Sequence, residues 1–143
     1  MPYTEPSKGA ELTYRLHLPK GTQSVNVIVA VKSTLAYNGT GHHYEIGFEG
    51  NDTNTGRSAR TTVFFNELLN EDPENIRSIY YPTVARRVKI DTVKLPVTLG
   101  SDDLVNLTVR PLDAGIVFEK IVVDYGGYKD SYLMMPETPY RKL

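Results

Sequence analysis

Apolar residues recur at every second position along much of this sequence, and no other feature constrains the fold as strongly. The alternation is clearest in segments 12–18, 44–48 and 105–109, where polar residues or glycine separate the apolar ones. Successive side chains of a β-strand point to opposite faces, so this pattern predicts strands with one buried face.

Two further segments are apolar on both faces. In Val25–Val31, valines at alternate positions are separated by polar Asn26 and then by Ile28 and Ala30, and Ile116–Val123 is also largely apolar. The first segment should therefore be a central strand that is covered on both sides. A β-branched and aromatic run at 62–65 predicts another strand, and segment 84–97 predicts one long bent strand or two that end near Pro96, which makes about eight strands in all.

Helical patterns are scarce. Segment 66–71 is the best helical candidate, and Asp72-Pro73 would end it within two turns. Most connections between the predicted strands are too short for crossover helices, so the strands should be antiparallel. We therefore predict an all-β fold, an antiparallel β-sandwich with one short helix at most. Its parts are an N-terminal extension (1–11), one sandwich domain (12–133) and a C-terminal tail (134–143).

Composition excludes several classes of function. The chain has 143 residues, a formal net charge of -1 and no cysteine. This charge does not fit a duplex nucleic-acid binder, and zinc–thiolate sites, disulfides and cysteine nucleophiles are ruled out. The longest apolar run, Val27–Val31, is too short to span a bilayer. We expect neither nucleic acid nor a membrane as partner. Met1–Pro6 lacks the features of a signal peptide, so the protein is cytoplasmic, a mature fragment or an excised piece of a larger protein, and we favour the excised piece.

No catalytic or metal-binding motif stands out. His42 and His43 are adjacent, so in a strand they would point to opposite faces. The only other histidine is His17, and no pattern of Glu or Asp around the pair matches a known metal spacing. One solvated and one packed histidine is the simpler interpretation. Acidic residues gather at 67–74, where a solvated face explains them. We therefore predict no catalytic residue and no metal ligand.

Tyrosine is the most suggestive residue type, with ten copies and no tryptophan. An exposed tyrosine can stack on a sugar ring while its hydroxyl forms a hydrogen bond, although tyrosines also cap the ends of sandwich cores. An arginine near such tyrosines could bind a carboxylate through two parallel hydrogen bonds, or form a surface ion pair on an exposed strand. The candidate ligand-binding residues are Tyr37, Asn38, His42, His43, Tyr80, Tyr81 and Arg86.

Two segments near the C-terminus resemble a known family. Residues 113–124 read D-A-G-I-V-F-E-K-I-V-V-D and resemble a strand signature of the C-terminal domain of glycoside hydrolase family 115. Residues 126–133, G-G-Y-K-D-S-Y-L, are similar to the ending of that domain. Tyr14–Pro19 and 33–37 look like an earlier strand and the loop after the next one. The resemblance runs from about Tyr14 to Thr138.

The resemblance implies a function. Enzymes of the family are α-glucuronidases that remove glucuronic acid, often 4-O-methylated, from xylan. The C-terminal piece would be a non-catalytic jelly-roll sandwich similar to carbohydrate-binding modules of families 6 and 35. Its expected partners are a plant cell-wall glycan or oligosaccharide and the catalytic domains of a secreted or periplasmic bacterial parent enzyme. The alternatives are a purely structural or oligomerisation module without ligand and, third, a stand-alone enzyme.

The sequence also departs from the family pattern. Ala114 replaces a proline, and Met134-Met135 replace Gly-Pro. Residues 1–11 contain no counterpart of the family's leading strand. That strand helps to hold calcium in related modules, so its loss argues against a calcium site, and we expect no cofactor. It would also leave a sheet edge unpaired. We predict that segment 1–11 or 133–143 lies over this edge, or that a second copy pairs there as a homodimer.

Overall fold

A computed structural model describes residues 10–32, 42–49, 60–64, 77, 81–131, 136 and 139. The described residues form seven strands and one short helix, which confirms an all-β sandwich. In chain order these are β1 (Leu12–His17), β2 (Ser24–Lys32), β3 (His43–Phe48), β4 (Arg60–Phe64), α2 (Tyr81–Arg86), β5 (Val88–Pro96), β6 (Leu104–Pro111) and β7 (Phe118–Asp124).

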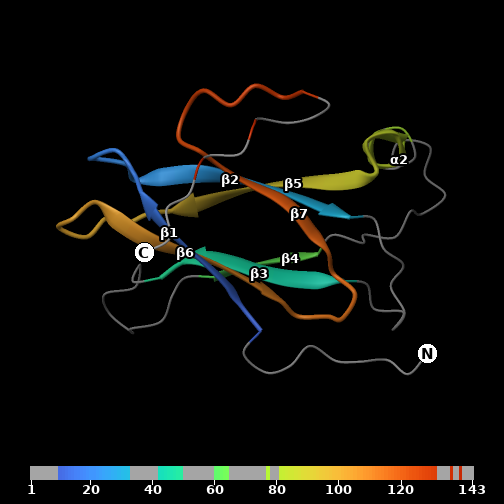
Figure 1. Ribbon diagram of the computed structural model, residues 1–143, viewed down its shortest axis with the longest axis horizontal. Helices are drawn as coiled ribbons and strands as arrows, with labels where there is room; N and C mark the ends of the chain where they lie inside the picture. The colour runs from blue at the N-terminus through green and yellow to red at the C-terminus, as the bar shows by residue number, and fades with distance from the viewer. Residues whose placement is uncertain are drawn as a thin grey trace.

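The strands make two sheets in which every pair is antiparallel, as predicted. One sheet has the order β1-β6-β3-β4 and the other the order β5-β2-β7. Tyr44 of β3 fixes how the sheets face each other, because it contacts Phe118 of β7 and Asp91 of β5. β3 therefore lies opposite β2, which is the strand between β5 and β7. Figure 1 shows β7 on the same side of the sandwich as β1, with β5 on the side of β4.

The core fills the space between the sheets. It combines the valines at alternate positions of β2 with Tyr44, Ile46 and Phe48 of β3 and the apolar residues of β6. On the opposite face of β2, Ile28 and Ala30 are also buried. This burial confirms the prediction of a central strand covered on both sides.

The helix is where the sequence-based prediction was wrong. Val84 was expected to begin one long bent strand or the first of two, but β5 starts only at Val88, and residues 81–86 form α2. Pro82 lies in the first turn, where its missing N–H costs nothing, and Arg87 ends the helix with φ 57°. The predicted helix at 66–71 lies outside the described residues. The predicted extension 1–11 and tail 134–143 fall almost entirely outside them too.

Candidate functional site

Four of the seven candidate residues lie in the described part of the chain, at one end of the sandwich. His43 begins β3 and pairs with Phe64 at the end of β4. Val88, which begins β5 two residues after α2, pairs with Lys32 at the end of β2. His42, His43, Tyr81 and Arg86 therefore share the end that includes α2. Figure 1 shows α2 at that end. Tyr37, Asn38 and Tyr80 lie outside the described residues.

His43 is held by a carboxylate. Asp113 Oδ2 lies 2.9 Å from His43 Nδ1 and also accepts a 2.7 Å hydrogen bond from the His43 backbone N–H. One face of the imidazole ring is used as well, since it stacks on Phe64 with 4.8 Å between ring centroids. Asp113 lies two residues after the end of β6, so this contact joins the β6–β7 connection to the start of β3.

His42 has a different environment from its neighbour. Its side chain is buried, with 1% of its surface exposed. Burial is the main cause that lowers the pKa of His42, and the adjacent His43 adds to it, while the carboxylate of Asp113 acts in the opposite direction. The histidine pair is thus one packed and one half-exposed residue, which is the simpler of the two sequence-based interpretations.

Arg86 already has a carboxylate partner within the chain. Its Nη1 and Nη2 donate hydrogen bonds of 3.0 and 2.8 Å to the two carboxylate oxygens of Asp130, and the Tyr128 hydroxyl donates to Oδ1 at 3.3 Å. The hydrogen bonds from Arg86 are the main cause that lowers the pKa of Asp130. This bidentate pair joins α2 to the segment after β7. The structure contains the ion pair that the sequence suggested for Arg86, but the residue lies on a helix rather than on a strand.

Tyr81 is the most exposed of the candidates. It is 60% exposed, and Val84 on the same helix is 55% exposed. Residues three apart on a helix share a face. Tyr81 and Val84 therefore form a small exposed apolar surface on α2. Beyond β7, Tyr125 has a similar exposure of 62%.

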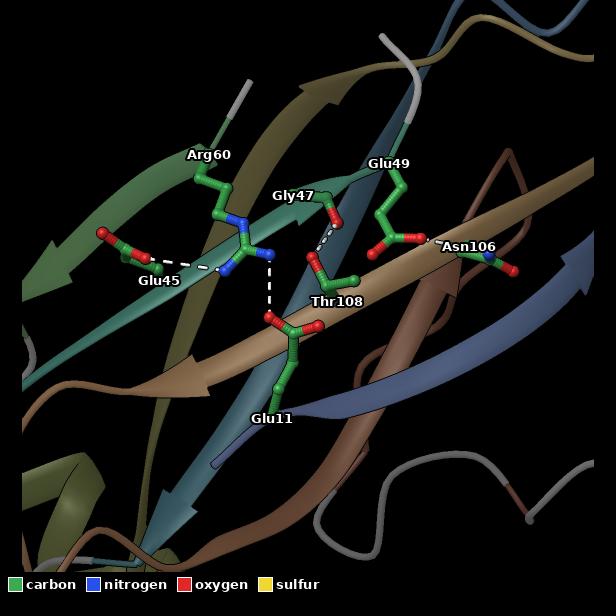
Figure 2. A network of polar contacts seen from close by, with 7 residues as sticks. All are labelled: Glu11, Glu45, Gly47, Glu49, Arg60, Asn106 and Thr108. Atoms are coloured by element: carbon green, nitrogen blue, oxygen red, sulfur yellow. Dashed lines mark hydrogen bonds and ion pairs between the residues drawn. The ribbon is translucent and has the colours of Figure 1, made fainter. Parts of the chain in front are cut away.

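A polar network lies on the outer face of the β1-β6-β3-β4 sheet, and no sequence pattern had predicted it (Figure 2). Arg60 of β4 bonds to Glu11, just before β1, at 2.7 Å and pairs with Glu45 of β3 at 3.7 Å. Thr108 of β6 donates a hydrogen bond to the Gly47 carbonyl and is buried despite its place on the outer face. These contacts link β4 to β3 and to the residue before β1, and β6 to β3.

Other signs of a ligand centre do not occur in the described part of the chain. No three His, Asp or Glu side chains of residues 10–32, 42–49, 60–64 and 81–131 gather as metal ligands would. Every buried polar side-chain atom of these segments has a hydrogen-bond partner. None of the described helices is long and apolar enough to cross a membrane.

The fold defines an antiparallel β-sandwich domain, and comparison with known proteins gives its family. The sequence model described as "Glycosyl hydrolase family 115 C-terminal domain" matches residues 1–137. Because the match covers nearly the whole chain, the chain belongs to this family of C-terminal domains. The resemblance inferred from segments 113–124 and 126–133 is therefore confirmed.

A solved structure shares the fold. It is a family 115 4-O-methyl-α-glucuronidase described as specific for decorated arabinogalactans, with a TM-score of 0.63 and 23% sequence identity. The match covers 85% of this chain but only 14% of the glucuronidase chain. This chain thus corresponds to a small part of that enzyme's length. No curated protein sequence matches this chain.

Proposed function

We propose that this chain is a non-catalytic accessory domain of a bacterial α-glucuronidase-type hydrolase that acts on plant cell-wall glycan outside the cytoplasm. The observation that carries the proposal is the match to the family 115 C-terminal domain over residues 1–137. The fold shared with a 4-O-methyl-α-glucuronidase supports it, and so does the small share of that enzyme to which the chain corresponds. The catalytic groups would belong to other domains of the parent enzyme.

Within this role, the end of the sandwich that includes α2 is the surface best suited to a sugar. Tyr81 offers an exposed ring for stacking, and the half-exposed His43 is fixed in place by Asp113 and Phe64. A rigid aromatic group loses little conformational entropy on binding. An exposed site with few hydrogen bonds would bind weakly, roughly in the millimolar to micromolar range.

A second candidate function is a structural module without ligand. Two contacts favour it, because the side chains expected to bind a ligand are already used inside the domain. Arg86 makes both of its parallel hydrogen bonds to Asp130, and His43 is engaged by Asp113. A uronic acid would have to displace Asp130 before it could bind Arg86 in the same way.

A titration distinguishes the two candidates. Neutral and glucuronic-acid-substituted xylo-oligosaccharides are added to the full chain while backbone amide shifts are followed. Glycan binding at the α2 end predicts shifts at residues 42–44 and 81–87 that Tyr81→Ala weakens by about tenfold. Tyr125→Ala, which removes an equally exposed ring elsewhere, is the matched control. Absence of shifts at millimolar oligosaccharide would support the structural module instead.

The non-catalytic assignment has its own test. The purified chain is incubated with glucuronic-acid-substituted xylo-oligosaccharides, and released uronic acid is measured. No turnover above the buffer control is expected. Turnover that copurifies with the chain and survives a second, unrelated purification would contradict the assignment.

A further inference from the structure

The ring of His43 is held so that one nitrogen is used inside the domain and the other faces outward. Nδ1 lies 2.9 Å from Asp113 Oδ2, and an ionised carboxylate oxygen can only accept a hydrogen bond. The proton of the neutral imidazole is therefore on Nδ1, and the lone pair is on Nε2. The same oxygen of Asp113 accepts a 2.7 Å hydrogen bond from the His43 backbone N–H, which fixes the carboxylate relative to the ring.

The Nε2 atom of His43 reaches the surface. It makes no hydrogen bond to any residue in the part of the chain that the structure describes. No buried side-chain nitrogen or oxygen in that part lacks a partner, so Nε2 must be accessible. The 35% exposure of the His43 side chain agrees with this. Because the ring is also stacked on Phe64, His43 presents a hydrogen-bond acceptor in a fixed direction.

The charges near this acceptor do not favour an anion. The Asp113 side chain is only 15% exposed, so water screens its negative charge incompletely. His42 stays neutral at neutral pH, because burial lowers its pKa. Further along the same outer face, Glu45 and Arg110 are cross-strand partners of opposite charge. A ligand carboxylate at Nε2 would meet a lone pair with a negative charge behind it, whereas a hydroxyl can donate to it.

We propose that His43 Nε2 accepts a hydrogen bond from a hydroxyl of a neutral sugar unit, and that Asp113 is the residue that positions the ring for this contact. The proposal rests on the proposed glycan-binding role and names what this residue recognises there, which is the neutral part of a glycan rather than a uronic acid. A metal ion could use the same nitrogen. However, protein metal sites take three or four ligands, and the described His, Asp and Glu side chains form no such group.

The proton on the ring can be observed without any ligand. In a proton–nitrogen correlation spectrum of the full chain at neutral pH, His43 should carry a proton on Nδ1 and none on Nε2. Asp113→Asn replaces the carboxylate with a group that can also donate, so both neutral forms of the ring should appear. A merely structural role of Asp113 would change stability but not the position of the proton. A wild-type ring with its proton on Nε2, or an unchanged spectrum in the variant, would overturn the proposal.

Oligosaccharide binding tests the contact itself. His43→Phe keeps a ring against Phe64 but removes the acceptor. It should weaken binding of neutral and of glucuronic-acid-substituted xylo-oligosaccharides equally, by about fivefold. Asp113→Asn should weaken both by a smaller factor, about twofold. His17→Phe is the control, because His17 is exposed and lies at the opposite end of the sheet, where it pairs with Leu104. Circular dichroism confirms that the variants fold.

Protonation gives a test that needs no altered residue in the wild-type chain. The pH is lowered until the spectrum shows a proton on both ring nitrogens of His43, so that Nε2 can no longer accept. The affinity of the wild type for the neutral oligosaccharide should then fall to that of His43→Phe, whose own affinity should stay the same over this interval. An affinity that does not fall would overturn the proposal.

The outcomes separate this proposal from glycan binding in general. If His43→Phe binds both oligosaccharides as the wild type does, or loses affinity only for the acidic one, the contact with a neutral hydroxyl is overturned while glycan binding by the domain stands. If the wild-type chain binds neither oligosaccharide at millimolar concentration, both are overturned.

Discussion

The Tyr44 hydroxyl donates a 3.1 Å hydrogen bond to Asp91 Oδ2, and this contact joins the two sheets through the core. Asp91 is also paired with Lys89 at 3.2 Å on the same edge strand. Burial and the nearby carboxylate raise the pKa of Tyr44 far above its ordinary value, so the hydroxyl stays protonated and can donate. Charged residues that point inward from β5 also discourage this edge from pairing with other chains.

Tyr44→Phe should destabilise the domain by about 1–2 kcal/mol, because it removes a hydrogen bond to a largely buried carboxylate. Urea unfolding measures the change in the free energy of unfolding. Tyr14→Phe, which alters a partly exposed tyrosine, should change it by less than about 0.5 kcal/mol. Equal effects of the two substitutions would show that the contact between the sheets does not stabilise the fold.

Stability should depend on His42 at mildly acidic pH. Burial lowers the pKa of His42 in the folded state from the ordinary value of 6.5, so the folded chain binds this proton less readily than the unfolded chain. The folded state therefore keeps its full stability above pH 6.5 and loses part of it as the pH falls below 6.5. His42→Gln should flatten the fall in unfolding free energy between neutral and acidic pH, whereas His17→Gln, at an exposed position, should not. If the unfolding free energy of His42→Gln fell with pH as steeply as that of the wild type, the prediction would be contradicted.

Arg60→Met should cost about 1–2 kcal/mol, because Glu11 and Glu45 would lose their common partner at a half-buried position. The matched control is Arg15→Met on the outer face of the same sheet. Arg15 and Asp102 are 3.9 Å apart and both exposed, so this change should stay within about 0.5 kcal/mol. Thermal unfolding of both variants gives the comparison, and similar melting temperatures would rule out a stabilising network.

Asp130→Asn should loosen the segment after β7 without unfolding the domain. The substitution removes the bidentate pair with Arg86, so amide exchange in residues 125–131 should accelerate while the core keeps its protection. Asp102→Asn, at another exposed ion pair, should leave that segment unchanged. Unaltered exchange after Asp130→Asn would mean that other contacts hold the segment.

The fold could be predicted largely from the alternation of apolar and polar residues, because the two-residue period of a strand is a local feature of the sequence. Val25–Val31 is the clearest case: the apolar Ile28 and Ala30 on its second face correctly predicted a central strand. α2 could not be predicted in this way. Its six residues, including Val84, are too few to show helical periodicity. Only Pro82, a residue type that is common in the first turn of a helix, is typical of a helix start.

The candidate site was less predictable because its geometry depends on residues far apart in sequence. The adjacent histidines predicted one packed and one solvated ring; His42 is packed as predicted, whereas the ring of His43 is only partly exposed. However, the partners Asp113 of His43 and Asp130 of Arg86 are 70 and 44 residues away. No local pattern links such pairs. The predicted sugar contacts at Tyr81 and His43 stay predictions.

The network around Arg60 has a consequence for evolution. Loss of Arg60 leaves Glu11 without this partner, and loss of Glu11 leaves Arg60 only its longer contact with Glu45, so positions 11 and 60 should vary together among homologous chains. Gly47 is the cross-strand neighbour of Arg60 on the outer face, and a larger side chain there would compete with the guanidinium for space. Position 47 should therefore tolerate larger residues only in lineages where arginine has been replaced at position 60.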